Sequence, residues 1–275
     1  MTPDVDTNEL ISESAFERHL LRLFGRPLLV MAEGLGEVVI LCRQTIYWLH
    51  SAERPSVIAQ LVAIGVDSIP VTLLTSLFTG MVLALQTGFS FRKVFNEPIY
   101  VGTVVGLSLT KELGPVLTAV VVAGRVGAAI AAELGTMKVT EQIDALYTLG
   151  TNPIRYLAVP RFIACLISIP LLTYFADFIG ILGGLLVAVY RLEVPQSVYM
   201  QEIRSLTWKE PAHGLAKSAV FAAIIVVISC YKGFSCEGGA EGVGKATTSA
   251  VVMSMVLILV CDYFLSALLV AFGVG

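Results

Sequence analysis

The chain has 275 residues, of which 56% are hydrophobic and 14% charged, and its formal net charge is −3. The apolar residues come in long blocks, a pattern that excludes an ordinary soluble domain and indicates a helical membrane protein. The slightly negative charge gives no sign of nucleic-acid binding, and a β-barrel is disfavoured because its strands would be about ten residues long and alternate in polarity.

The N-terminal segment is acidic and polar, and it lacks the basic and apolar regions of a cleaved signal peptide. Residues 10–50 form a first unit, in which the apolar stretch from Pro27 to Leu49 is interrupted by Glu33, Glu37 and Arg43. An apolar stripe with charges on another face predicts a helix that lies in the membrane interface. We therefore divide the chain into an N-terminal cytoplasmic or interfacial segment, residues 1–55, and a membrane domain, residues 56–275.

Five longer apolar segments follow, and each exceeds or reaches the roughly 20 residues that a spanning helix needs. They cover residues 57–88, 99–131, 159–190, 213–233 and 246–272. Pro70, Pro115 and Pro170 lie inside them, and each removes one backbone hydrogen bond, so we expect kinks there.

The basic residues at the ends of these segments are unevenly distributed, and this bias predicts the orientation in the membrane. The richer set, on the predicted cytoplasmic side, is Arg18, Arg22, Arg26, Arg43, Arg54, Lys138, Arg155, Arg161, Lys232 and Lys245. The opposite set is Arg92, Lys93, Arg191, Arg204 and Lys209. We therefore expect the N-terminus and the loops 132–158 and 234–245 to face the cytoplasm.

Charged residues inside the apolar segments are candidates for function, because such residues are expensive in lipid. They include Asp67, Arg125, Asp177 and Asp262, and above all the neighbours Lys111 and Glu112, which precede Gly114-Pro115. Adjacent helical residues point about 100° apart, so Lys111 and Glu112 are not expected to pair with each other. Asp262 and Asp67 are candidate partners. Either a structural ion pair or a polar site for a charged headgroup or ion fits the pattern.

The loop that follows the second segment is too long and too patterned for a simple connection. Val139, Ile143, Leu146 and Leu149 mark the apolar face of a short helix, with Gly150 as its expected C-cap. Two interpretations stay open: an interfacial helix that only joins two spans, and a helix that docks into a partner's groove.

No catalytic or metal-binding pattern occurs, so we expect neither an enzyme nor a metal site. The five cysteines are scattered. Residues 239–246 nearly match a phosphate-binding loop, but Ala246 replaces the required hydroxyl and a membrane segment, not a strand, precedes it. We interpret these residues as a glycine-rich cytoplasmic turn that leads into the last span.

Several stretches together resemble the MlaE family, the permeases of ABC transporters that work with MCE proteins in bacterial lipid trafficking. The most specific is LTKELGPVLTAVVVAGRVGAAIAAELGTMKVTEQIDAL at 109–146. The others are GMVLALQTG at 80–88, NPIRYLAVPRF at 152–162, GILGG at 180–184 and KATTSAVV at 245–252. The resemblance implies an all-α fold with an N-terminal elbow helix and five transmembrane helices, like the membrane half of certain lipid exporters.

The resemblance also implies partners and a location. Two copies form a homodimer in the bacterial inner membrane, and two cytoplasmic ABC ATPase subunits supply ATP and Mg²⁺ chemistry, so this chain needs no cofactor. A periplasmic MCE-domain protein binds the opposite face, and some members have a STAS-domain partner. The loop helix at about 132–150 then corresponds to the coupling helix. The ATPase-docking residues that we expect are Glu133, Lys138, Thr140, Glu141, Gln142 and Asp144.

The family's lipid pocket, between two protomers, implies which residues touch the phospholipid. It lies near Leu83, Lys111, Glu112 and Leu113, to which we add Asp262 as a candidate partner of the charges. Arg92 and Lys93 are expected at the rim of the pocket. Lys111 stands where well-known relatives carry arginine, so the charge is kept but the bidentate fork for phosphate is lost.

Two alternative functions are consistent with the residues alone. An ion-coupled transporter or channel would use Asp67, Glu112, Asp177 and Asp262 as a proton path and would need no ATPase. A structural membrane scaffold would tolerate neutralisation of the buried charges.

Overall fold

The computed structural model describes residues 26–51, 54–95 and 100–272, and these fold as helices joined by short turns. Five helical stretches are long and apolar enough to cross a membrane, as the sequence predicts. They are Arg54–Val94, Val101–Val139, Ile154–Leu192, Lys209–Phe234 and Gly239–Ala271. Each is longer than the predicted apolar segment, because the helices continue into polar sequence beyond it.

The first and second spans are interrupted. The first consists of α3 (Arg54–Ile64), a 3₁₀ turn at Val66–Ser68 and α4 (Ile69–Phe95). The second consists of α5 (Val101–Ser108), α6 (Gly114–Val122) and α7 (Ala128–Val139), separated by π-helical turns at Leu109–Leu113 and Ala123–Gly127. The expected breaks near Pro70 and Pro115 are therefore present in the chain.

The third span is a π-helical turn, Ile154–Ala158, followed by the uninterrupted helix α9 (Val159–Leu192), which contains Pro170. The short helix α10 (Gln196–Arg204) leads to α11 (Lys209–Phe234). The last span is α12 (Gly239–Ala271). The glycine-rich segment 239–246 was predicted as a turn, and this is wrong: Gly238 and Gly239 adopt positive φ and the helix begins at once.

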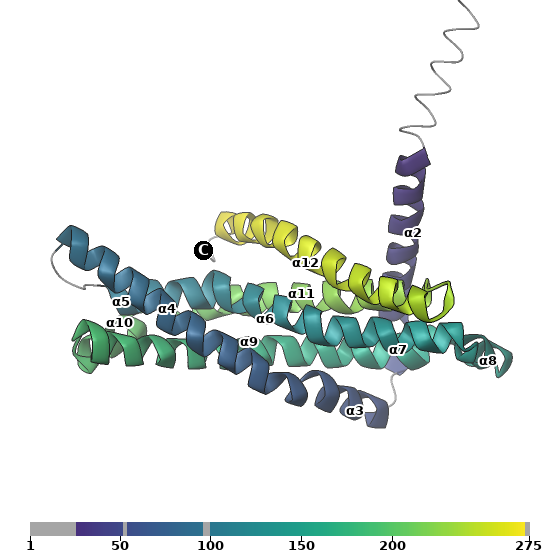
Figure 1. Ribbon diagram of the computed structural model, residues 1–275, viewed down its shortest axis with the longest axis horizontal. Helices are drawn as coiled ribbons and strands as arrows, with labels where there is room; N and C mark the ends of the chain where they lie inside the picture. The colour runs from purple at the N-terminus through teal and green to yellow at the C-terminus, as the bar shows by residue number, and fades with distance from the viewer. Residues whose placement is uncertain (1–25, 52–53, 96–99, 273–275) are drawn as a thin grey trace, which may run out of the picture.

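The spans run side by side along the long axis of the molecule (Figure 1). The fourth span is the central one, with 61% of its apolar window buried, whereas the windows of the first and fifth spans are only 17% and 11% buried. The inner spans therefore form the core, and the first and fifth spans expose most of their apolar surface.

The helix α2 (Arg26–Tyr47) stands across the axis of the bundle near the end that carries α8 (Figure 1). Leu41 and Thr45 are buried against the bundle, and Leu35, Val39 and Ile46 are exposed. The predicted helix is present, and its location in a membrane interface stays a prediction. The first part of the predicted unit, residues 10–25, lies outside the described residues.

Glycines let the first span approach the third. A Cβ atom at Gly80 would collide with the backbone carbonyl of Gly180, and one at Gly183 would collide with the carbonyl of Leu77. At the same crossing the Ser76 hydroxyl donates a hydrogen bond to the Ala176 carbonyl. Small residues thus bring α4 and α9 into backbone contact, as in other membrane helix pairs.

The loop helix predicted between the second and third spans is α8 (Gln142–Thr148). Its Ile143 is buried, whereas Leu149 just beyond it is exposed. Gly150 has φ +73° and donates to the Tyr147 carbonyl, and the Thr151 amide donates to the Leu146 carbonyl. These two bonds make a Schellman C-cap at the predicted glycine.

The crossing of α4 and α9 gives a prediction for stability. Gly80→Ala introduces a methyl group where the Gly180 carbonyl leaves no space, so we expect about 1–3 kcal/mol of destabilisation. Gly244→Ala, in a helical position with no atom within 4 Å, is the matched control and is expected to cause no loss. Thermal unfolding in detergent measures both variants, and equal midpoints would contradict this packing.

Candidate functional site

The first element of the site is the π-helical turn at Leu109–Leu113, which carries Lys111 and Glu112. Pro115 has no N–H, so the α-helical hydrogen bond to the Lys111 carbonyl cannot form. Instead, the His213 imidazole of α11 makes a hydrogen bond to the Lys111 backbone. A Cβ at Gly214 would collide with the Thr110 carbonyl, so α11 packs closely against the widened turn. The Gly-Pro pair therefore shapes the turn that presents both charges.

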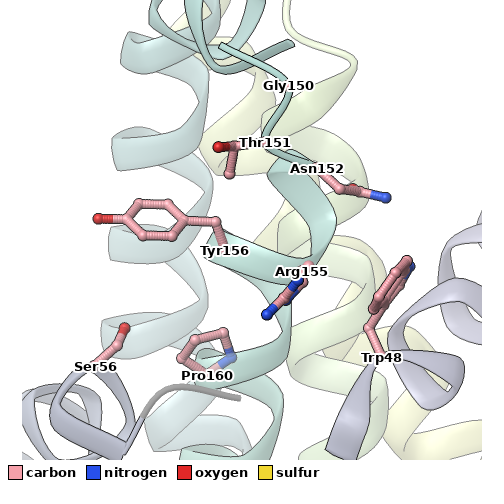
Figure 2. Close-up of a pocket in the computed structure, with 8 residues that line it drawn as sticks. All are labelled: Trp48, Ser56, Gly150, Thr151, Asn152, Arg155, Tyr156 and Pro160. Atoms are coloured by element: carbon pink, nitrogen blue, oxygen red, sulfur yellow. The ribbon is translucent and has the colours of Figure 1, made fainter. Parts of the chain in front are cut away.

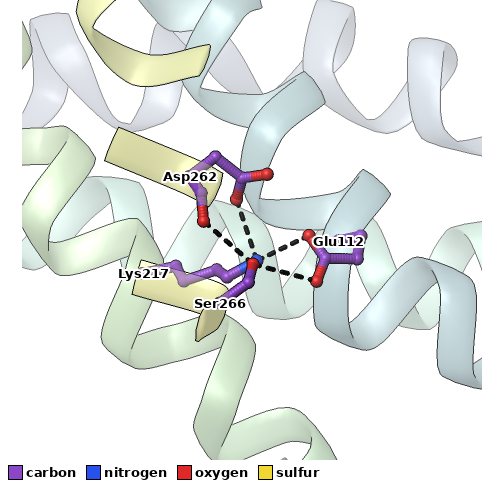
Figure 3. A network of polar contacts seen from close by, with 4 residues as sticks. All are labelled: Glu112, Lys217, Asp262 and Ser266. Atoms are coloured by element: carbon purple, nitrogen blue, oxygen red, sulfur yellow. Dashed lines mark hydrogen bonds and ion pairs between the residues drawn. The ribbon is translucent and has the colours of Figure 1, made fainter. Parts of the chain in front are cut away.

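Lys217 of α11 is the centre of a charge network in the bundle (Figure 3). Its side chain is completely buried, and its Nζ lies 2.6 Å from Oε2 of Glu112 and 2.8 Å from Oδ1 of Asp262. The Ser266 hydroxyl of α12 donates to Oε1 of Glu112 at 3.2 Å. One ammonium group thus joins the second, fourth and fifth spans, and we call Glu112, Lys217, Asp262 and Ser266 the charge centre.

Lys111 makes a separate ion pair at the start of α11. Its Nζ lies 2.7 Å from Oε2 of Glu210, and a quarter of its side chain is exposed. The Glu112 side chain is 46% exposed although its carboxylate contacts Lys217. Both charges therefore have a partner within the chain and also face open space at a level well inside the second span.

The prediction that Lys111 and Glu112 do not pair with each other is confirmed, but the proposed partners need correction. Asp262 shares Lys217 with Glu112, and Asp67 lies beside Arg125, away from both Lys111 and Glu112. The true partners, Lys217 and Glu210, were missed. Lys217 lies inside the predicted fourth span. A search for charged residues inside the apolar segments, which found Asp262, therefore also finds Lys217 once the lysines of this span are included.

The other predicted pocket residues lie toward the α5 end of the bundle. Leu83 and Leu113 are partly buried against the same apolar cluster, formed by α4, α5, α9 and α10. Nη2 of Arg92 donates to the Leu192 carbonyl at 3.1 Å, and Lys93 is exposed. The structure thus brings Leu83 near the Lys111–Leu113 turn, while Arg92 caps the end of α9.

Most polar residues expected to dock an ATPase are engaged within the chain. Lys138 pairs with Asp144 at 3.1 Å, and the Gln142 amide donates to the Thr140 hydroxyl at 3.1 Å. Glu133 is bound at 2.9 Å by Arg161, a buried arginine of α9. These pairs fix α8 and the end of α7 on the bundle. Glu141 remains exposed at positive φ before α8.

Two hollows lie at the end of the molecule that carries α8. One, of about 410 Å³, lies between the end of α2 and the start of the third span (Figure 2). The Arg155 guanidinium stacks there over the Trp48 ring at 5.5 Å, and Asn152 and Tyr156 line the same space. The other, of about 280 Å³, is lined mostly by apolar atoms of α2, α8 and α11. The short helix α8 therefore lines the second recess, whereas the first lies beside the residues that follow its C-cap.

The charge centre gives a second stability prediction. Lys217→Met leaves the two carboxylates without their cation, and we expect a loss of about 3–5 kcal/mol in the free energy of unfolding. The triple variant Glu112→Gln, Lys217→Met, Asp262→Asn removes every charge of the charge centre and should recover most of the lost free energy of unfolding. Lys245→Met, at an exposed pair with Glu241, is the control and should lose less than about 1 kcal/mol. The free energy of unfolding of each variant is measured in mixed micelles. A Lys217→Met variant as stable as the wild type would contradict the charge network.

Comparisons with known proteins agree with this architecture. The model of the MlaE permease family matches residues 57–268. A probable ABC transporter permease of Rickettsia typhi is 51% identical over 216 residues, which are 78% of this chain and 82% of that protein. A probable ABC transporter permease of Synechocystis sp. is 41% identical over 254 residues, 92% of this chain and 94% of that protein.

A plant protein is similar over much of the same region. Protein TRIGALACTOSYLDIACYLGLYCEROL 1, chloroplastic, of Arabidopsis thaliana is 42% identical over 237 residues, 84% of this chain and 65% of that protein. The family model covers the spans that carry the charge centre. The chain therefore belongs to the MlaE permease family and is a multi-pass membrane permease of the ABC transporter class.

Proposed function

We propose that this permease is the membrane subunit of an ATP-driven transporter that moves phospholipids between the bacterial inner membrane and a periplasmic MCE protein. The observation that carries the proposal is the charged surface of the second span. Lys111 and Glu112 keep exposed surface well inside a membrane span, although each already has a partner. Charges at such a depth face a cavity or a polar ligand, because lipid tails cannot solvate them.

The two signs of charge suit a phospholipid headgroup. The Lys111 ammonium would pair with the phosphate, and the Glu112 side chain, which is 46% exposed although both carboxylate oxygens have partners in the chain, would face an amine in a headgroup that carries one. Leu83 and Leu113, partly exposed beside the turn, would contact acyl chains. The Arabidopsis relative bears the name of a glycerolipid, which is the same broad class of substrate.

A second copy of the chain would enclose this site. The first and fifth spans carry the least buried apolar windows, and their exposed faces include Leu74 and Phe78 on α4 and Val256 and Leu259 on α12. The charge centre and Lys111 connect to α11 and α12, and Leu113 packs toward α4. A homodimer that joins first and fifth spans would leave a cavity over the second span of each protomer.

The end of the molecule with α8 would dock the ATPase subunits on the cytoplasmic side. The support is geometric: α8 is short, capped and tied to α7 by Lys138–Asp144, and it lines a recess that a partner's side chains would fill. The opposite end, with α10, would face the periplasm and the MCE protein, so the N-terminus would be cytoplasmic. A STAS-domain protein would act on the ATPase and would not touch this chain.

The ion-coupled alternative has less support. Its four carboxylates do not form one path: Glu112 and Asp262 share Lys217, whereas Asp67 lies beside Arg125. Asp177 is buried in α9 against Gly114, where a Cβ atom would collide with its Oδ1. ABC transporter permeases, moreover, act with an ATPase. We therefore retain the ATP-driven function.

A charge exchange tests the role of Lys111 in transport. Lys111→Glu places a carboxylate opposite Glu210, so we expect both stability and lipid transfer to fall. In Lys111→Glu/Glu210→Lys the ion pair is restored, so stability should return, while transport should stay reduced about tenfold or more because a charge-assisted contact to phosphate is lost. Transfer of labelled phospholipid between the reconstituted complex and its MCE acceptor is the measurement.

The matched control is Glu241→Lys/Lys245→Glu, which exchanges an exposed ion pair at the start of α12, away from the proposed cavity. It measures how far an exchange of charges by itself lowers stability and lipid transfer. Wild-type lipid transfer by both exchanged variants would overturn the assignment of Lys111 to the lipid site.

A further inference from the structure

A second charged pair lies in the membrane region, and the charge centre does not explain it. Arg125 of the second span lies beside Asp67, which sits in the 3₁₀ turn between α3 and α4. Their side chains are 38% and 55% exposed. At about 1.5 Å per residue, Arg125 is roughly 21 Å from Lys111 and roughly 21 Å from the end of α7. Arg125 lies inside the predicted apolar segment 99–131, six residues or roughly 9 Å from its end, where a charge is still costly without a polar neighbour.

The contacts of Arg125 leave one edge of the guanidinium open. Its Nη1 donates to the Ser68 hydroxyl at 2.7 Å and to the Ala63 carbonyl at 3.3 Å. Its Nη2 lies 3.6 Å from Oδ2 of Asp67, well beyond the roughly 2.7–2.9 Å of a charge-assisted hydrogen bond. The interrupted first span thus anchors Nη1 and holds Nη2 loosely opposite an exposed carboxylate.

Arg125 repeats the arrangement at Lys111. Each cation is the middle residue of a π-helical turn in the same span, Leu109–Leu113 and Ala123–Gly127, and such turns are frequent at functional sites. Each lies near a carboxylate with about half of its side chain exposed, Glu112 in one case and Asp67 in the other.

An open strip connects the two places. Between Glu112 and Arg125 the partly or fully exposed residues recur every four positions: Leu113, Val116, Leu117, Val120, Val121 and Gly124. At its far end the strip lies between the outer spans, because Gly124 faces Met255 of α12 while Arg125 contacts the first span. Acyl chains would find an apolar surface along this strip, with a cation at each end of it.

We propose that Arg125 is a second binding station for the phosphate of a phospholipid, nearer the coupling-helix end than Lys111, with Asp67 as its counter-charge when no lipid is bound. The inference rests on the proposed lipid transport and deepens it. The phosphate would take the open Nη2 edge, and Asp67 would then be released toward the headgroup. A lipid would occupy this station at a different stage of transport from the station at Lys111.

Site-specific photocrosslinking in the assembled transporter tests the proposal. Benzoylphenylalanine is placed at Val66, which is exposed beside Asp67, at Leu113 beside the station at Lys111, and at Phe178, which is exposed on α9, as a control for surrounding lipid. Val116 replaces Leu113 if that variant does not assemble. Cells are labelled with ³²P-phosphate and irradiated, and labelled permease is counted after purification of the complex.

We expect labelled lipid at positions 66 and 113. Arg125→Gln should lower capture at position 66 about tenfold, the loss of one charge-assisted contact, and leave capture at 113 and 178 unchanged. Arg125→Lys should retain part of the signal because it keeps the charge. Asp67→Asn should not lower it, since the carboxylate only competes with phosphate.

The other outcomes separate the two proposals and the two sources of phosphate. Capture at 113 without capture at 66, or capture at 66 that ignores Arg125→Gln, overturns the second station alone. No capture above the Phe178 control at either position overturns lipid transport itself. Loss of capture in excess inorganic phosphate, or equal capture of a photoreactive diacylglycerol without phosphate, overturns recognition of the lipid phosphate.

Discussion

The buried ammonium group of Lys217 is the interaction on which the rest of the site depends. A lysine without exposed surface is stable only if anionic partners replace its water, and here Glu112 and Asp262 supply them from two other spans. This requirement fixes the position of α12, whose own apolar window is only 11% buried, against the centre of the bundle. It also fixes the rotation of the π-helical turn, so that Lys111 is turned toward Glu210 and keeps exposed surface. A structural ion network thus creates the polar surface that we assign to the substrate.

Much of the architecture follows from the sequence, because long apolar segments, and the glycines and prolines that interrupt or end them, determine the local structure of the backbone. The five spans, the crossing helix α2 and the capped helix α8 were all predicted from such signals. The pairing of the charges was not, because it depends on which helices meet. Asp262 and Lys217 lie on different spans, and neither apolar pattern nor spacing says that they face each other. At Gly239 the prediction from local sequence was wrong. The glycine-rich segment is typical of a turn, but positive φ occurs only at Gly238 and Gly239, and the residues that follow are helical.

Two π-helical turns interrupt the helix of the second span, whereas the helix α9 of the third span runs without interruption for 34 residues. A widened turn frees backbone groups and moves side chains off the regular helical positions, and both turns here are centred on a cation. The Gly114–Asp177 contact and the His213 hydrogen bond hold the first of them, and the broken first span holds the second through Ser68 and Ala63. The irregular backbone is therefore supported by neighbouring helices wherever a charge is presented, as membrane proteins require.

The central claim is that the exposed charges of the second span bind the phosphate of a phospholipid between two copies of this chain. The most direct measurement is an experimental structure of the assembled transporter in lipid nanodiscs. The account predicts a dimer with phospholipid density over the second span and with a phosphate oxygen within hydrogen-bond distance of the Lys111 ammonium group. A dimer whose lipid phosphates all lie away from Lys111 and Arg125, or a chain that packs these surfaces against protein alone, would contradict it.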